Sequence, residues 1–221
     1  MPDLDFEVAG AEIPAFAAVP MLLFKLRIVN KVGGSSRGIR PIQAIALRCQ
    51  IQIAVTRRHY GPAVRPRLLD VFGESSRWSE TLRDLLWTHA SAVVPPFSES
   101  IVADLPVPST YDFDVVATKY FDALEGGDIP LTLLFSGTIF YEGEAGNLQV
   151  APIPWSKEAA YRLPVATWRE MIARYYPDTA WIRLHKDVFD RLYQYKVKHG
   201  LPTWEEALTH LLQASGEEVR P

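Results

Sequence analysis

Cysteine is almost absent from this chain. Its single residue, Cys49, cannot form an intrachain disulfide, and structural disulfides belong to oxidising compartments. Apolar runs long enough to cross a bilayer are lacking as well, since the stretch 13–24 is too short and contains two prolines. The acidic N-terminus lacks the basic start of a secretory signal. We therefore expect a soluble cytoplasmic protein without membrane contact.

An excess of positive charge is also missing. Lysine and arginine number 23 against 26 acidic residues, a net charge of −3, which argues against a whole-protein field that attracts nucleic acid. The five histidines are scattered without a metal-ligand spacing, and no Gly-x-Ser-x-Gly motif occurs. We therefore expect no metal, no cofactor and no enzymatic activity.

One carboxylate pair keeps an enzymatic alternative open. Asp112 and Asp114 fall at alternate positions of a run that we predict as a strand, so both side chains would share one face. Two carboxylates placed in this way can serve acid–base chemistry. A solvated polar face opposite Phe113 and Val115 explains the same spacing.

What the chain has in abundance is two-residue alternation. Every second side chain from Ile45 to Val55 is apolar, which predicts a strand with one buried face and Cys49 as a small core side chain. A parallel strand covered on both faces would be apolar throughout, so this strand is predicted to be antiparallel. Similar runs, separated by proline and glycine turns, occur at 4–8, 22–29, 87–94, 101–107, 111–117, 131–141 and 148–153. The predicted fold is α+β and mainly β: an antiparallel β-sandwich or bent sheet of about seven or eight strands with a C-terminal helical segment.

Helical spacing appears in two parts of the chain. A short insertion at 64–86 interrupts the strands, and from Pro164 onward apolar residues recur at three and four positions. Thr203 with Glu206 forms a capping box for the last helix. We predict an antiparallel β domain over 1–156 that contains the insertion. A C-terminal α-rich segment over 157–214 is packed on or appended to it, and 215–221 is a frayed tail.

Two groups of residues are candidates for partner binding. The only dense basic cluster lies in a loop with glycine and proline and comprises Arg57, Arg58, His59, Arg65 and Arg67. Loops held by a rigid sheet often bind partners, and arginine suits carboxylate or phosphate groups. The second group, Tyr175 and Tyr176, would form a protein-binding patch if exposed. An ordinary charged loop and a set of core aromatic side chains are the structural alternatives.

Several stretches of the chain resemble a single family. They are Pro-Asp-Leu-Asp-Phe-Glu-Val at 2–8, Ala-Leu-Arg-Cys-Gln-Ile at 46–51, Leu-Leu-Trp-Thr-His at 85–89, Thr-Tyr-Asp-Phe at 110–113, Leu-Leu-Phe-Ser-Gly-Thr at 133–138 and Lys-Glu-Ala-Ala-Tyr-Arg-Leu-Pro-Val at 157–165. Together they are similar to an uncharacterised bacterial family, a domain of unknown function common in actinobacteria, over essentially the whole chain. Because genes of that family tend to lie beside NiFe hydrogenase genes, the resemblance implies an accessory role near hydrogenase. It implies no catalytic residues.

The segment 179–214 resembles a ribbon-helix-helix unit, because a strand is followed by a helix, Gly200 and a second helix. In such a unit Ala180, Ile182 and Leu184 would pack, and the outer strand face could read DNA through Trp181, Arg183 and His185. Four acidic residues close to the expected phosphate positions weigh against DNA binding: Asp187, Asp190, Glu205 and Glu206. A strand and helical hairpin packed on the sheet is the structural alternative.

The leading hypothesis is a non-enzymatic accessory protein that acts through protein–protein contacts, with a hydrogenase subunit or maturation factor as the partner that the resemblance implies. The alternative is a DNA-binding or dimerising regulator that uses its C-terminal unit, and a homodimer fits that alternative. Nucleic acid is not the expected partner of the leading hypothesis.

Overall fold

The computed structural model describes residues 2–31, 40–109, 115–177, 182 and 184–215 of the chain. Their contacts divide the protein into two compact units, Met1–Pro177 and Asp178–Pro221, here called the β unit and the C-terminal unit. The division falls farther along the chain than the predicted domain boundary at residue 156. Within the described ranges, no helix combines the length and the apolar character that crossing a membrane requires.

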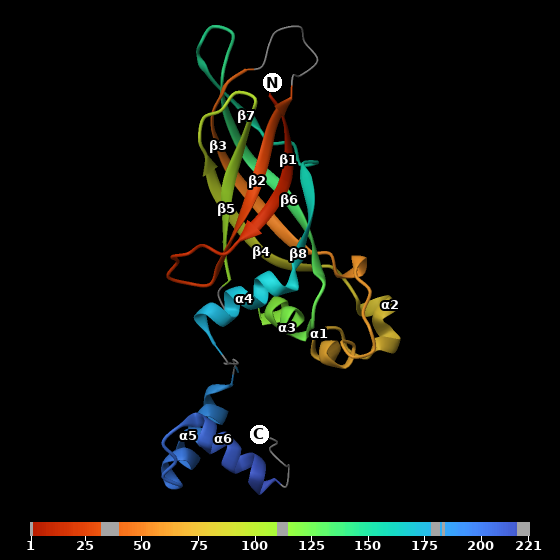
Figure 1. The fold of residues 1–221 in the computed structure, drawn as a ribbon, viewed down its shortest axis with the longest axis vertical. Coiled ribbons are helices and arrows are strands. Elements are labelled where there is room, and N and C mark those ends of the chain that lie inside the picture. Colours follow the sequence, from red (N-terminus) through yellow and green to blue (C-terminus); the bar gives the residue numbers. More distant parts are fainter. Residues whose placement is uncertain (1, 32–39, 110–114, 178–181, 183, 216–221) are drawn as a thin grey trace. The chain divides into compact units, whose positions relative to one another are not determined.

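The β unit is built on two antiparallel sheets (Figure 1). The smaller has the order β1-β2-β5, with bounds Asp3–Glu12, Met21–Lys31 and Ser100–Pro108. The larger has the order β4-β3-β6-β7, with bounds Leu85–Val94, Ile42–Ile53, Asp128–Glu142 and Leu148–Pro152. An eighth strand, β8 (Glu158–Pro164), pairs with the first half of β6. The predicted fold class and strand number are therefore confirmed.

The two sheets enclose one core because β4 contacts β5 on one side and β1 contacts β8 on the other. Strand β3 lies between β4 and β6, which confirms the central antiparallel strand predicted from 45–55. Its inward side chains are buried as the alternation required: Ile45, Leu47, Cys49, Ile51 and Ile53. Burial raises the pKa of the Cys49 thiol to about 12, so this side chain is an unreactive part of the core.

At Gly137 the backbones of β3 and β6 lie close together. A Cβ atom at this position would lie 2.1 Å from the carbonyl oxygen of Ala46, and the backbone φ of +135° also disfavours any other residue. The register between β3 and β6 runs through Gly137 without a shift, so the two strands approach closely here without a bulge.

Short helices lie at one end of the sheets (Figure 1). The predicted insertion at 64–86 is a series of short helical turns: η2 (Pro66–Leu68), α1 (Leu69–Phe72), η3 (Ser75–Arg77) and α2 (Trp78–Thr81). Just before them, η1 (Val55–Arg57) follows β3. Two longer helices complete this end: α3 (Val115–Ala123) and α4 (Val165–Tyr175).

Helix α3 corrects the strand predicted at 111–117. Residues 110–114, with Asp112 and Asp114, lie outside the described residues, and the chain is helical from Val115 onward. The buried residues Ala117, Tyr120, Phe121 and Leu124 recur at three and four positions, the period of a helix. Alternation over a few residues was outweighed by this longer helical pattern.

An aromatic cluster attaches the helices to the sheets. The ring of Phe121 from α3 lies 5.1 Å from Trp87 of β4 and 5.2 Å from Trp168 of α4, both in edge-on geometry. All three side chains are buried. Neither indole N–H has a hydrogen-bond partner among the described residues, so edge-on ring packing is the interaction shown for these two indoles.

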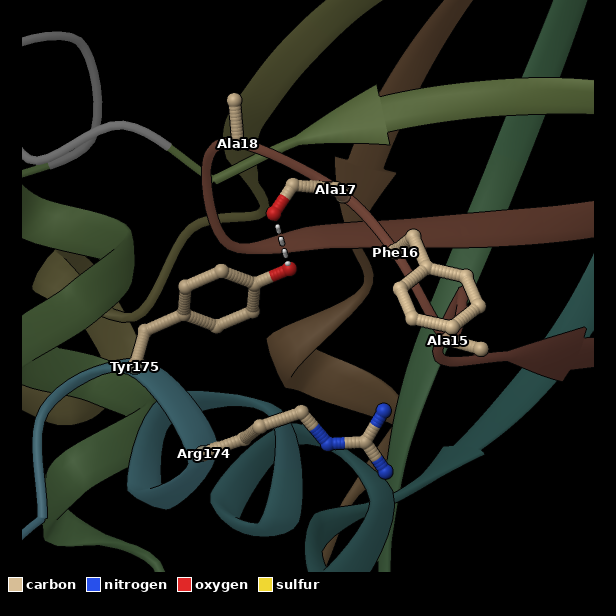
Figure 2. A pocket seen from close by; sticks show the side chains of 6 residues that line it. All are labelled: Ala15, Phe16, Ala17, Ala18, Arg174 and Tyr175. Atoms are coloured by element: carbon tan, nitrogen blue, oxygen red, sulfur yellow. Dashed lines mark hydrogen bonds between the residues drawn. The ribbon is translucent and has the colours of Figure 1, made fainter.

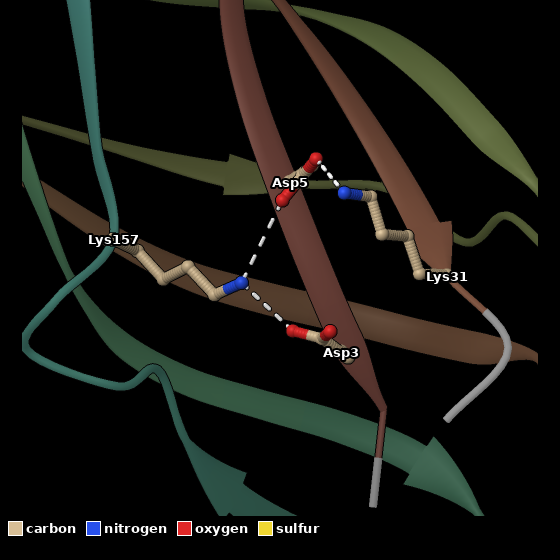
Figure 3. A network of polar contacts seen from close by, with 4 residues as sticks. All are labelled: Asp3, Asp5, Lys31 and Lys157. Atoms are coloured by element: carbon tan, nitrogen blue, oxygen red, sulfur yellow. Dashed lines mark hydrogen bonds and ion pairs between the residues drawn. The ribbon is translucent and has the colours of Figure 1, made fainter. Parts of the chain in front are cut away.

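Charged side chains join β1 to its neighbours on both sides (Figure 3). Lys157, just before β8, lies 2.7 Å from Asp3 and 3.7 Å from Asp5 of β1. Asp5 also pairs with Lys31 of β2. Hydrogen bonding to Lys31 is the main reason that the pKa of Asp5 is lowered. The two contacts of Lys157 connect residues more than 150 positions apart and close the side where β1 meets β8.

The C-terminal unit is a helical hairpin. Helix α5 (Lys186–Lys198) and helix α6 (Trp204–Ala214) are joined through Gly200, whose φ is +63°. Thr203 caps α6 by accepting a hydrogen bond from the Glu206 amide at 3.1 Å, which confirms the predicted cap. Among the described residues of this unit, only Ala207 is fully buried.

Candidate functional site

A surface cavity of the β unit lies where the β1–β2 loop meets the end of α4. Residues Ala15, Phe16, Ala17, Ala18, Arg174 and Tyr175 line a shallow cavity of about 500 Å³. The Tyr175 hydroxyl donates to the Ala17 carbonyl at 2.9 Å, and Arg174 donates to the Pro14 carbonyl at 3.3 Å. Figure 2 shows both side chains reaching from the helix toward the loop. We call this the loop–helix surface.

Phe16 is the exposed aromatic side chain of the loop–helix surface. Its ring is 97% exposed, although the residues on either side of it are attached to α4 by the two hydrogen bonds above. A loop that is fixed at two points presents its side chains in a defined position. The arrangement therefore holds an apolar ring in solvent beside the guanidinium of Arg174.

Three members of the predicted basic cluster make contacts within the protein. Arg58 donates to the carbonyl of Asp128 and, at 2.5 Å, to that of Gly126. Arg67 donates to the carbonyl of Asp122 at 2.7 Å. Arg65 donates to the carbonyl of Tyr60 at 3.1 Å. Arg58 and Arg67 therefore attach their segment to the end of α3 and the start of β6, whereas Arg65 makes a local contact. These contacts give the three guanidinium groups a structural role.

Arg57, the first member of that cluster, does not take part in these contacts. It lines a second cavity of about 300 Å³ together with Arg162 of β8, and the remaining lining residues are Pro130, Leu131, Ala160 and Tyr161. Within the described part of the chain, neither arginine makes an ion pair. Two guanidinium groups beside an apolar floor suit a carboxylate or phosphate group. His59, the remaining member, is exposed.

Of the predicted tyrosine pair, only Tyr175 lines the loop–helix surface. Tyr176 follows α4 as its last cap residue and is half-buried. The sequence did not single out Phe16, Arg174 or Arg162. The apolar, proline-bounded stretch 13–20 was a usable signal for Phe16, because an apolar loop has no core face of its own to fill.

The buried polar groups of the β unit are structural. The hydroxyls of Tyr60 and Tyr120 lie 2.9 Å apart, and Tyr60 donates to the Val55 carbonyl at 2.8 Å. Burial raises the pKa of both tyrosines, so both stay neutral near pH 7. Among the described residues no group of three or more His, Cys, Asp or Glu side chains could hold a metal ion.

The residues of the DNA-binding alternative are only partly described. Trp181 and Arg183 lie outside the described residues, whereas His185 is exposed and directly precedes α5. Ile182 and Leu184, predicted to pack as the inner strand face, are 71% and 36% exposed. Neither side chain is therefore fully buried by the described residues.

No curated protein matches the chain. The model of a family of unknown function, DUF6084, matches residues 1–220. This agrees with the resemblance to a domain of unknown function, whereas the match says nothing of hydrogenase genes or of a ribbon-helix-helix unit. Because the family model covers nearly the whole length, the chain belongs to the DUF6084 family.

Proposed function

We propose that this protein is a non-enzymatic accessory protein that binds a protein partner through its loop–helix surface. The observation that carries the proposal is Phe16: an aromatic ring that is 97% exposed on a loop held to α4 by Tyr175 and Arg174. A large apolar side chain left in water gains free energy when a partner covers it. Because its loop is already ordered, little further conformational entropy is lost on binding.

The chemistry of the surface indicates the kind of partner. Aromatic and arginine side chains dominate the binding energy of protein interfaces, and Phe16 and Arg174 lie in one cavity. Arg174 forms an ion pair with Glu170 at 3.3 Å, and the arginine side chain remains 42% exposed. A matching partner would place an apolar side chain against Phe16 and a carboxylate near Arg174.

Arg57 and Arg162 extend the proposal to a second contact on the β unit. Both are exposed, and they line one cavity without an ion pair among the described residues. An acidic side chain of the partner would bind there with two guanidinium groups. The proposed partner is therefore acidic overall, with an apolar anchor.

A hydrogenase subunit or maturation factor is the partner that the resemblance implies, and this finer identification stands on the resemblance alone. The test is affinity purification of the full chain from a native host, with identification of bound proteins by mass spectrometry. We expect one partner to be recovered with the wild type and reduced at least several-fold with Phe16→Ala.

Trp155→Ala provides a matched control, since Trp155 is 93% exposed in the β unit but does not line the cavity. This variant should retain the partner. Equal capture by wild type, Phe16→Ala and Phe16→Ala/Arg174→Ala would overturn the proposed surface. Recovery of a partner unrelated to hydrogenase would overturn only the finer identification.

A regulator that acts through the C-terminal unit is the second candidate. Helices α5 and α6 form where the resemblance to a ribbon-helix-helix unit requires them, which favours this candidate. Over residues 186–214, however, four basic residues are balanced by four acidic ones, so the helices offer no excess positive charge to phosphates. Of the two activities in this candidate, dimerisation has the better physical support.

A further inference from the structure

The two helices of the C-terminal unit have wider apolar faces than their hairpin covers. On α5, Phe189, Tyr193 and Val197 follow each other at four-residue spacing and are 44%, 53% and 61% exposed. Side chains with this spacing share one helix face. They form an exposed apolar stripe along the full length of α5.

Helix α6 carries a second stripe at the same spacing. Leu208 and Leu212 are 39% and 44% exposed, and Trp204 precedes them by four residues. The Trp204 ring lies 5.1 Å from Phe189 and 6.4 Å from Tyr193. The two stripes therefore meet at Trp204 and form one continuous surface, which we call the hairpin face.

The hairpin buries too little to be stable alone. Ordering its backbone costs about 1–2 kcal/mol per residue, whereas Ala207 is the only side chain fully buried among the described residues of this unit. Units of this size usually need a disulfide, a metal or association to fold. Residues 178–221 contain no cysteine, so a disulfide cannot supply the missing stability. Burial of the hairpin face against another surface can supply it.

We propose that the hairpin face binds the same face of a second copy of this chain. The side chains of the hairpin face other than Trp204 are 39–61% exposed, which leaves an area on the order of several hundred Å² per copy, a substantial part of the ~800 Å² that each partner contributes to a standard interface. A patch of this size is at the upper end for a monomer. Two-fold pairing of one apolar surface with itself is the commonest way to bury it.

The charges around the hairpin face permit this pairing. Helix α5 carries Lys196 and Lys198 near its end, and α6 begins with Glu205 and Glu206. With four basic and four acidic residues over 186–214, two copies have no net repulsion to overcome. Lys196 Nζ also lies over the Trp204 ring, 5.9 Å from its centre, so a positive charge borders the hairpin face.

Two exposed residues before α5 also favour a second copy of the chain as the partner of the hairpin face. Ile182 and Leu184 are 71% and 36% exposed, so a second copy could cover them together with the stripes. This inference is independent of the loop–helix surface, because that surface belongs to the β unit. Failure to capture a partner through Phe16 would leave the dimer unaffected.

The first test measures the mass of the full chain by light scattering after size exclusion, and by sedimentation over a range of concentrations. We expect twice the mass of one chain for the wild type. Val197→Glu/Leu212→Glu should raise the dimer dissociation constant by roughly 100-fold or more, since each charge would be buried without a partner. Val93→Glu, at a position 78% exposed on β4, is the matched control and should remain dimeric.

A second measurement locates the contact. A photo-crosslinking amino acid at position 193 should give a product of twice the chain mass whose crosslinked peptides both come from residues 186–214. A wild type that is monomeric at every concentration would overturn the proposal, as would a dimer that survives Val197→Glu/Leu212→Glu. Crosslinks from position 193 into residues 1–177 of the same chain would also overturn it, since the chain's own β unit would then cover the hairpin face.

Discussion

The β unit and the C-terminal unit use similar side chains to opposite effect. In the β unit some forty hydrophobic residues are buried in one connected core, so large side chains such as Phe24 and Trp168 are hidden almost completely. In the C-terminal unit Phe189, Tyr193 and Leu212 stay 44–53% exposed on regular helices. A similar apolar pattern therefore produces a self-contained fold in one unit and an open surface in the other.

Strand pairing explains the difference. The sheets of the β unit join residues far apart in sequence, for example Asp128 of β6 with Pro164 of β8, and each added strand covers its neighbours. Among the described residues of the C-terminal unit, each of the two helices has one neighbouring helix to cover its apolar side chains. The comparison predicts that stability depends on interior residues in the β unit and on association in the C-terminal unit.

The largest effect is expected from removing a ring at the centre of the aromatic cluster. Phe121→Ala should destabilise the β unit by about 3–5 kcal/mol, because the cavity left beside Trp87 and Trp168 cannot close fully. Urea unfolding followed by tryptophan fluorescence measures this change. The same substitution at Phe189 should change the β-unit transition by less than about 0.5 kcal/mol. Equal losses would show that the two units fold as one.

Gly137→Ala should produce the next largest change. The added Cβ would collide with the Ala46 carbonyl, and φ of +135° is unfavourable for alanine, so we expect a loss of about 1–3 kcal/mol in the β unit. Gly61→Ala is the control, because nothing lies within 4 Å of its added Cβ. A Gly137→Ala protein with wild-type urea midpoint would contradict the close approach of β3 and β6.

A buried polar contact gives the third prediction. Asn30 is 4% exposed and its amide group donates to the carbonyls of Arg40 and Ser98, both at 2.9 Å. Asn30→Leu should destabilise the β unit by about 1–3 kcal/mol, since both carbonyls lose their donor. The exposed Gln43→Leu on β3 should change stability by no more than about 0.5 kcal/mol. Stability unchanged by Asn30→Leu would mean that water replaces the amide.

Much of the β unit could be predicted from sequence because its strands bury one face each. The alternation of 45–55 and 131–141 was sufficient to place β3 and β6. Strand β8 was missed, since Ala159, Tyr161 and Leu163 form a short and weakly apolar run whose pairing with β6 is set by tertiary contacts. Helix α3 was mistaken for a strand because its first residues also alternate.

The candidate site was harder to predict than the fold. Clustering in sequence grouped Arg57 with Arg58 and Arg67. In the structure Arg58 donates to a carbonyl of the α3–β6 connection, Arg67 donates to a carbonyl at the end of α3, and Arg57 lines a cavity with Arg162. The closeness of these arginines in sequence does not indicate which backbone carbonyl groups each guanidinium group will bond to in the folded chain. The apolar stretch 13–20 was a signal for Phe16, but the attachment of its loop to α4 became visible only in the structure.

The smallest change in stability is expected from removing exposed ion pairs. These pairs are long-range in the β unit and local in the C-terminal unit. Hydrogen bonding to Lys31 lowers the pKa of Asp5 below its usual value of 3.8. The ionised carboxylate therefore stabilises the β unit above pH 3.8, and this contribution is lost as the pH falls through the lowered pKa. Because these groups are exposed, Asp5→Asn should cause only a small loss near pH 7, which decreases with added salt.

Asp190→Asn is the counterpart, because Asp190 pairs with Lys186 within a single turn of α5. It should leave the β-unit transition unchanged at every pH, since no strand depends on it. Acid titration of unfolding, followed by circular dichroism for wild type and both variants, makes the comparison. The wild-type and Asp5→Asn curves should converge at low pH, where Asp5 is protonated. A constant offset between them down to pH 2 would mean that Asp5 acts through packing, and β1 would then be held without help from its charges.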